Sequence, residues 1–133
     1  MESLRIATMP NGELTYRRGE IWWIELDPAV GVETKKTRAC LILQNDFGNK
    51  QSSLTTVAPF LARKNYPFVV NFHATPENGL DSDRGLHLNQ IRAIDAQRIK
   101  KKLGVIEEYY WAEIKSAIAV QLQHNVARIP PLQ

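Results

Sequence analysis

The segment from residue 17 to residue 46 constrains the fold of this chain most strongly. Its sequence is RRGEIWWIELDPAVGVETKKTRACLILQND, in which two apolar runs, 21–26 and 40–43, flank a connection of turn-forming, charged and hydroxyl residues. Asp27-Pro28 ends the first run, because proline fixes its own φ and biases the residue before it towards extended conformations. Gly31 permits a turn with positive φ. The pattern predicts two strands joined by a polar loop.

Arg38 stands at the end of this loop, directly before the second strand. Its planar guanidinium would be held by rigid structure at a strand mouth, beside a polar loop, and such a group is suited to hold a phosphate. An ordinary β-hairpin with a solvated charged loop would show the same spacing. The spacing alone therefore leaves both interpretations open.

Turn-forming residues divide the rest of the chain into three further strands and a helix. Apolar side chains at three- and four-residue steps from Tyr110 to Leu122 predict an amphipathic helix. Asp95 can cap a short helical turn that ends at Arg98. Short strands followed by one helix predict a mainly β fold, a strongly bent antiparallel sheet or partly open barrel. The expected strands are 21–26, 39–44, 54–61, 68–72 and 86–94, with a turn at 45–49 and a plain polar loop at 75–85.

Length and composition predict one globular domain. The chain has 133 residues, 44% of them hydrophobic and 23% charged, which is enough for a real core and too little for two domains. We expect a domain at residues 16–125, a loose arm at 1–15 and a tail at 126–133. The net charge of +3 and the pI near 9.1 permit a polyanionic partner without requiring one. Basic residues cluster at 35–38, 63–64 and 100–102, and such clusters suit either solvated faces or a phosphate track.

Several function classes find no support in the sequence. The single cysteine, Cys40, excludes an intramolecular disulfide and lies in an apolar run, where it is expected to be a small buried residue rather than a nucleophile. No grouping of His, Cys, Asp and Glu has metal-ligand spacing, and no Gly-rich phosphate loop is present. We therefore expect neither metal nor cofactor. Residues 1–15 do not resemble a signal peptide, and no apolar run is long enough for a membrane, so a cytoplasmic protein is expected.

Two sequence blocks carry a resemblance to a known family. The first is Arg18-Gly19-Glu20-Ile21-Trp22, followed by Leu26-Asp27-Pro28, Gly31-Val32-Glu33 and the run from Arg38 to Leu43. The second is LNQIRAIDAQRI, residues 88–99. In this order and at this separation they resemble the MazF/PemK family of toxin endoribonucleases, from Tyr16 to about Gln123. Ala39 stands where the family usually has proline.

The resemblance implies a fold, a reaction and partners. The fold would be an SH3-like partly open barrel with a C-terminal helix, of the MazF toxin type, assembled as a homodimer. The activity would be sequence-selective cleavage of single-stranded mRNA without metal, by attack of the 2′-OH to leave 2′,3′-cyclic phosphate and 5′-OH ends. A cognate antitoxin, with an acidic tail over the RNA groove, would silence the toxin. Arg38 takes the place of the motif arginine.

Three positions depart from the family pattern. Leu61 replaces a hydroxyl residue at the end of the third strand, and Val32 replaces a histidine after the turn glycine. His87-Leu88-Asn89 replaces an Arg-x-Asp pair on the fifth strand. Period-two alternation would put His87 and Asn89 on one strand face. Because histidine titrates near neutrality, His87 is a candidate for proton transfer beside Arg38, although an unremarkable surface histidine would show the same pattern. His73 and His124 carry no comparable argument.

Recognition of single-stranded RNA combines base stacking with hydrogen bonds to base edges. Two alternatives to the nuclease stay open: a non-enzymatic or attenuated toxin of the same fold, such as a gyrase poison, and an SH3-like module that binds RNA or protein without cutting. The Arg38 motif and the Gln90-Ile91-Arg92 block favour the nuclease over the gyrase poison. The predicted catalytic residues are Arg38 and His87, and the predicted RNA-binding residues are Glu33, Lys35, Lys36, Thr37, Gln44, Asn45, Leu61, Asn89, Gln90 and Arg92.

Overall fold

A computed structural model describes residues 15–26 and 36–123 of the chain. Within these residues the strands are β1 (Glu20–Glu25), β2 (Thr37–Ile42), β3 (Leu54–Leu61), β4 (Val69–Phe72), β5 (Arg84–His87), β6 (Arg92–Asp95) and β7 (Ile99–Val105). The helices are α1 (Asp46–Gln51) and α2 (Tyr110–Leu122), with short 3₁₀ turns η2 (Leu88–Gln90) and η3 (Ala96–Arg98). Residues 1–14, 27–35 and 124–133 lie outside the description, and with them the predicted tail at 126–133 and nearly all of the predicted arm at 1–15.

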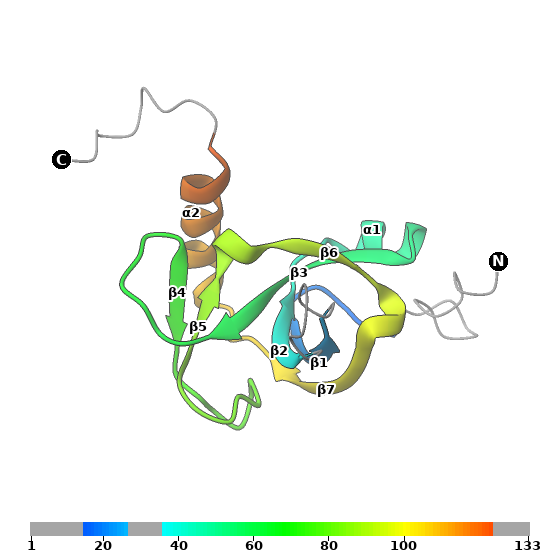
Figure 1. The fold of residues 1–133 in the computed structure, drawn as a ribbon, viewed down its shortest axis with the longest axis horizontal. Helices are drawn as coiled ribbons and strands as arrows, with labels where there is room; N and C mark the ends of the chain where they lie inside the picture. The colour runs from blue at the N-terminus through cyan, green and yellow to red at the C-terminus, as the bar shows by residue number, and fades with distance from the viewer. Residues whose placement is uncertain (1–14, 27–35, 124–133) are drawn as a thin grey trace.

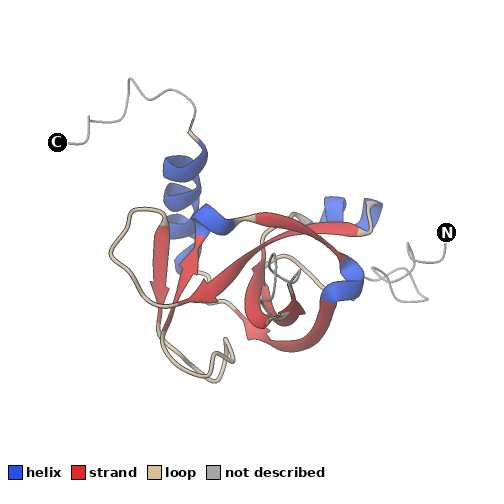
Figure 2. Ribbon diagram, viewed as in Figure 1, coloured by secondary structure: helices blue, strands red, loops and turns tan. Residues whose placement is uncertain are grey.

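The strands form one antiparallel sheet in the order β4-β5-β3-β2-β1-β7, and β6 adds to β3. Figure 1 shows β1, β2, β3, β6 and β7 curving round a ring, with α2 standing beside β4 and β5. No ladder joins β6 to β7 in the described part of the chain, so the ring is not closed. The predicted mainly β, partly open barrel with a C-terminal helix is confirmed (Figure 2).

Strand alternation divides the apolar side chains between two cores. One face of the sheet packs under α2, where Phe60, Phe72 and Leu86 meet Tyr110 and Ile114. The other face fills the ring, because every second residue of each strand points to it. This inner core holds Tyr16, Ile24, Cys40, Ile42, Val57, Ile94 and Ala96.

The predicted fifth strand, 86–94, is wrong as a single strand. β5 pairs with β3 through Phe60 and Leu86, and continuing that register would set Val57 opposite Asn89. Val57 instead pairs with Arg92 of β6. The 3₁₀ turn η2 thus inserts three residues into the ladder and lets the chain cross from one end of β3 to the other. Asn89 therefore does not share a strand face with His87.

Two further elements differ from the prediction. Residues 46–51, predicted to start as a turn, form the helix α1, because the Asn45 side chain caps it by accepting from the Gly48 N–H at 2.7 Å. The basic run 100–102 lies in β7, a strand that the sequence did not reveal. β7 is an edge strand, where exposed lysines are common, and Lys102 pairs with Glu20 at 3.0 Å. The predicted turn capped by Asp95 is confirmed: Asp95 accepts from the Gln97 N–H at 2.8 Å.

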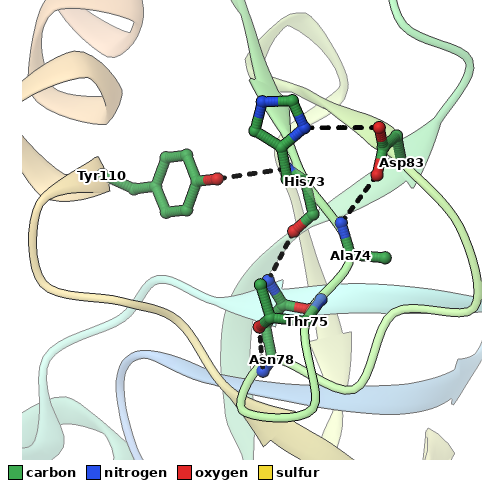
Figure 3. Close-up of polar contacts among 6 residues, drawn as sticks. All are labelled: His73, Ala74, Thr75, Asn78, Asp83 and Tyr110. Carbon is green, nitrogen blue, oxygen red and sulfur yellow. Dashed lines mark hydrogen bonds and ion pairs between the residues drawn. The ribbon is translucent and has the colours of Figure 1, made fainter.

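The connection from β4 to β5 is tied down by polar contacts (Figure 3). Asp83 accepts from the Ala74 N–H at 2.8 Å and lies 3.3 Å from His73 Nδ1. Tyr110 of α2 accepts from the His73 N–H at 3.1 Å. The predicted plain loop is therefore held against both the sheet and the helix. No helix in the described part of the chain has the length and apolar character to cross a membrane.

Candidate functional site

Arg38 and Arg92 approach the same buried thiol. Cys40 and Ile42 of β2 point into the inner core, so period-two alternation directs Arg38 to that side as well. Arg92 opens β6 opposite Val57 of β3. The charges of Arg92 and Arg38 both act on Cys40. The fold thus brings together two arginines that the sequence presented in separate blocks, 54 positions apart along the chain.

The barrel is open where these arginines lie. β6 covers β3 only from Leu54 to Val57. The β2–β3 ladder ends at Cys40 and Pro59, since proline has no N–H to continue it. We call the strand ends beyond this point the rim. Arg38 lies at the rim on β2, and continuing the ladder would set Leu61 opposite it.

Cys40 is a structural residue. It is fully buried, and burial raises the pKa of its thiol to about 12 in spite of the nearby arginines. A thiol that keeps its proton is a poor nucleophile. The prediction of a small buried cysteine is confirmed.

His87 is buried, which corrects the expectation of a histidine on a polar strand face. It is 8% exposed, and its Nε2 donates to the Ala62 carbonyl at 2.7 Å. The bond fixes a proton on Nε2 and leaves Nδ1 as the second ring nitrogen. His87 and Leu86 still point to opposite sides of β5, as strand alternation requires, and Leu86 lies in the core under α2.

A small hollow of about 50 Å³ opens where the β2–β3 ladder ends. Thr37 and Arg38 both line it. Arg84 lines it too, and the sequence analysis missed this residue because it started the strand at Leu86. Its guanidinium forks onto the Asp81 carboxylate at 3.1–3.2 Å. The remaining lining residues are Trp23, Ala39, Phe60 and Asp81.

Gln44 and Asn45 lie elsewhere, and local structure uses their polar groups. Asn45 caps α1, and the Gln44 amide donates to Asn49 and to the Leu54 carbonyl, both at 3.1 Å. They line a hollow of about 420 Å³ against α2, whose other lining residues are Arg18, Leu43, Thr56, Ile91, Ile118 and Leu122. The structure does not bring them to Arg38.

The other predicted binding residues are scattered. Leu61 is half-buried and pairs with Gly85. Lys36 is exposed just before β2, and Asn89 and Gln90 are exposed in the turn η2. Glu33 and Lys35, and the departure at Val32, lie outside the described residues. Within the described ranges no group of three or more His, Cys, Asp or Glu side chains could hold a metal ion.

The loop that follows Leu61 carries a further signal. Arg63 and Lys64 were noted only as a basic pair, yet they stand beside the exposed aromatic Tyr66. Basic residues next to an aromatic residue are a signal for nucleic-acid binding that the sequence already contained.

The partly open barrel and its basic rim define a small barrel protein with a surface suited to a polyanion. Residues 17–122 match the family described as "PemK-like, MazF-like toxin of type II toxin-antitoxin system". The chain belongs to this toxin family, so the predicted resemblance is confirmed.

Individual relatives agree with the family assignment. The chain is 35% identical over 115 residues to a protein of Staphylococcus saprophyticus named endoribonuclease MazF, covering 84% of this chain and 95% of the relative. The predicted enzyme class is confirmed at this level. Among solved structures, the Mycobacterium tuberculosis toxin MazF-mt6 superposes with a TM-score of 0.68 at 19% identity, covering 80% of this chain and 98% of that one. A MazE-MazF structure from Deinococcus radiodurans gives 0.67 at 23% identity, with coverage of 83% and 97%; both likenesses show the fold.

Proposed function

We propose that this protein is a toxin that cuts single-stranded mRNA at selected sequences, in a reaction that needs no metal. The observation that carries the proposal is the pair Arg38 and Arg92, two guanidinium groups from different strands whose charges both reach the buried Cys40 thiol, next to the open rim. A phosphodiester placed there would meet cations from two directions. Two fixed cations stabilise charge that develops on phosphate oxygens better than solvent can.

In the proposed reaction the RNA supplies its own nucleophile. The 2′-OH attacks the adjacent phosphorus, the bond to the 5′-oxygen breaks, and the products carry a 2′,3′-cyclic phosphate and a 5′-OH. The proton of the 2′-OH must leave and the 5′-oxygen must gain one. Arg38 and Arg92 would hold the non-bridging oxygens, and the planar fork of arginine suits this two-point contact.

Proton transfer is assigned to His87. Leu61 can neither donate nor accept a proton, whereas an imidazole can do both. Because Nε2 is engaged with Ala62, Nδ1 would exchange the proton. A second candidate function, an attenuated or non-catalytic toxin, is favoured by the same two observations: the missing hydroxyl at Leu61 and the burial of His87.

The proposed partners are a second copy of the chain and a cognate antitoxin. One structural neighbour is titled an endoribonuclease in complex with its cognate antitoxin from a mycobacterial species, and others are MazE-MazF structures. An acidic antitoxin segment over the basic rim would exclude RNA from Arg38 by occupying the same surface. The proposed setting is the cytoplasm.

The test is cleavage of a long, weakly structured RNA by the purified full chain in excess EDTA, with mapping of new 5′ ends. We expect cuts at a small set of sequences, and new 5′ ends that accept phosphate from a polynucleotide kinase without prior dephosphorylation. Activity that EDTA abolishes and magnesium restores would contradict the mechanism. RNA binding without any cut would favour the non-catalytic alternative.

A further inference from the structure

The loop between β3 and β4 lies beside the proposed site. It runs from Ala62 to Phe68 and begins directly after Leu61 at the rim. The Tyr66 carbonyl accepts from the Val69 N–H at 3.0 Å, which closes a β-turn with Pro67 at its second position, where proline is favoured. The Phe68 carbonyl accepts from the Leu88 N–H at 3.0 Å. The loop is therefore anchored at its C-terminal end.

Two buried or half-buried side chains brace the loop from below. The Asn71 amide donates to the Lys64 carbonyl at 3.0 Å and accepts from the Lys64 N–H at 3.3 Å. His87 donates to the Ala62 carbonyl at 2.7 Å. Gly85 leaves the room that this packing needs, because a Cβ there would come 2.8 Å from the Ala62 oxygen. Such bracing holds the loop in one shape before any ligand arrives.

The exposed side chains of the loop include a flat aromatic ring and two cations. Tyr66 is 53% exposed and stacks on Phe68, with ring centroids 5.2 Å apart and planes at 21°. Arg63 and Lys64 are exposed beside it. With Asn65 and Asn71 they line a hollow of about 360 Å³. An exposed aromatic ring, cations and amides are the groups that single-stranded nucleic acids meet in proteins, for bases, phosphates and base edges respectively.

Arg63 and Lys64 differ in whether a nearby carboxylate offsets their positive charge. Asp83 lies near Arg63, whose charge is among the causes that hold the pKa of that carboxyl down, after the Ala74 N–H and His73. Lys64 has no such carboxylate among the described ion pairs. Lys64 is therefore the stronger phosphate partner of the two.

We propose that the β3–β4 loop is a stacking subsite for one base of the bound RNA, adjacent to the cut. Tyr66 covers the base, and Lys64 holds a neighbouring phosphate with help from Arg63. Asn71 acts as a positioning residue, and the Nε2–H of His87 holds the Ala62 carbonyl in addition to the proton transfer proposed for its Nδ1. The inference rests on the proposed function and adds a subsite to it. The positive charge of the loop would attract either RNA or an acidic peptide. The stacked ring pair favours RNA, because it suits a planar base and an acidic peptide has none.

The test measures the affinity of the full chain for uncleavable 2′-O-methyl decaribonucleotides of U, A and C at one fixed salt concentration. Tyr66→Ala should weaken binding of the preferred oligonucleotide at least about fivefold, the lower end of what losing one stacked base costs. Tyr66→Phe keeps the ring and should change the affinity less than about twofold on the same scale. Tyr109→Ala is the matched control, since Tyr109 is 70% exposed at the start of α2, and should have no effect.

An abasic scan of the oligonucleotide identifies the base. One abasic position should weaken binding to the unchanged protein and have no further effect on Tyr66→Ala, which is the signature of a direct pair in a double-mutant cycle. Equal losses at every position in both proteins would overturn the subsite. So would a Tyr66→Ala variant that binds RNA normally but loses its antitoxin. If the unchanged protein binds no oligonucleotide and cuts no RNA, the proposed function fails as well; normal cleavage with silent Tyr66→Ala overturns only the subsite.

Discussion

Cys40 lies within reach of the charges of Arg38 and Arg92, and yet burial rather than charge decides its chemistry. Arginines lower a thiol pKa and burial raises it. Here the thiol is fully buried, and its pKa rises from the ordinary value of 9.0 to about 12. The two arginines therefore leave the thiol protonated and inert, and the role we propose for them is to bind the RNA phosphate at the rim.

The raised pKa predicts a pH dependence of stability. Below about pH 9 the thiol is protonated in both the folded and the unfolded chain, and its contribution is fully present. Between 9.0 and about 12 the unfolded chain releases the proton while the folded chain keeps it. The free energy of unfolding should fall there by up to about 1.4 kcal/mol per pH unit from this group.

Urea unfolding of the unchanged chain and of Cys40→Ala from about pH 8 to 11 checks this: the two curves of unfolding free energy against pH should converge as pH rises. Parallel curves would show that Cys40 is not protected.

His87 presents a second residue-scale prediction. His87→Ala should lower turnover about 10²-fold, the usual size of a general acid or base effect. His87→Gln keeps an N–H for the Ala62 carbonyl but does not titrate, and should stay slow. Leu61→Thr should help little.

Single-turnover cleavage rates of these variants at one pH measure the outcome. Recovery in His87→Gln would mean that the residue only positions the β3–β4 loop. Vigorous cleavage by Leu61→Thr with a silent His87→Ala would mean that the natural chain is an attenuated nuclease.

At this scale the sequence showed residue types but not surroundings. Arg38 and Arg92 could be selected from two blocks because their motifs are specific. The burial of His87 could not, because it depends on the Ala62 carbonyl, which a different strand brings to it. Likewise Gln44 and Asn45 look like free amides in the sequence, but the cap of α1 and the start of β3 use them.

At the scale of elements, the connection from β4 to β5 depends on one buried carboxylate. Glu107, which is 9% exposed, accepts from the Thr75 hydroxyl at 2.6 Å and from the Asn78 amide at 3.2 Å. Asn78 is fully buried. Gly79 and Gly104 allow the loop and β7 to approach so closely that a Cβ on Gly104 would overlap the Glu77 carbonyl. The loop is thus attached to the edge strand by side-chain and backbone contacts together.

Glu107→Ala should destabilise the protein by about 1–3 kcal/mol, because it leaves buried donors without an acceptor. Glu108→Ala is the matched control: its side chain is exposed, and its effect should stay within about 0.5 kcal/mol. Urea unfolding monitored by tryptophan fluorescence measures both. Equal stability of the two variants would contradict the role given to Glu107.

Elements were predictable where local pattern decided them. β3 and α2 were correct to within a residue, since alternation and helical spacing are local signals. The split of 86–94 into β5, η2 and β6 was not predictable. The three-residue insertion depends on how β5 and β6 pair with different parts of β3, which is distant in the sequence. β7 was missed because its lysines mask the strand pattern at an edge, and α1 was missed because Gly48 and Asn49 are weak helix formers.

At the scale of the whole molecule, exposed apolar surface marks a face for assembly. The hollow beside α2 is bordered by Leu43, Ile91, Ile118 and Leu122, and Leu122 is 62% exposed. Apolar surface of this kind commonly marks an interface. The proposed homodimer could bury it.

Sedimentation equilibrium should therefore give twice the 15.2 kDa of one chain. Leu122→Glu should shift the equilibrium towards the monomer, since a carboxylate is costly in an apolar contact, while Tyr109→Glu should not. A dimer that Leu122→Glu leaves unchanged would place the interface elsewhere.

Cleavage by Arg38 variants at one mapped site is the sharpest test of whether the Arg38 guanidinium stabilises the phosphate during the reaction. Arg38→Lys keeps the charge and loses the two-point fork, so single-turnover cleavage should slow at least about tenfold, roughly 1.4 kcal/mol in activation free energy. Affinity for an uncleavable oligonucleotide should change much less. Arg17→Lys is the control and should cut at the normal rate, because Arg17 precedes β1 while Arg38 pairs with Ile24 near the other end of that strand. The account predicts slow cleavage with nearly normal binding for Arg38→Lys; unaltered cleavage by Arg38→Ala would contradict it.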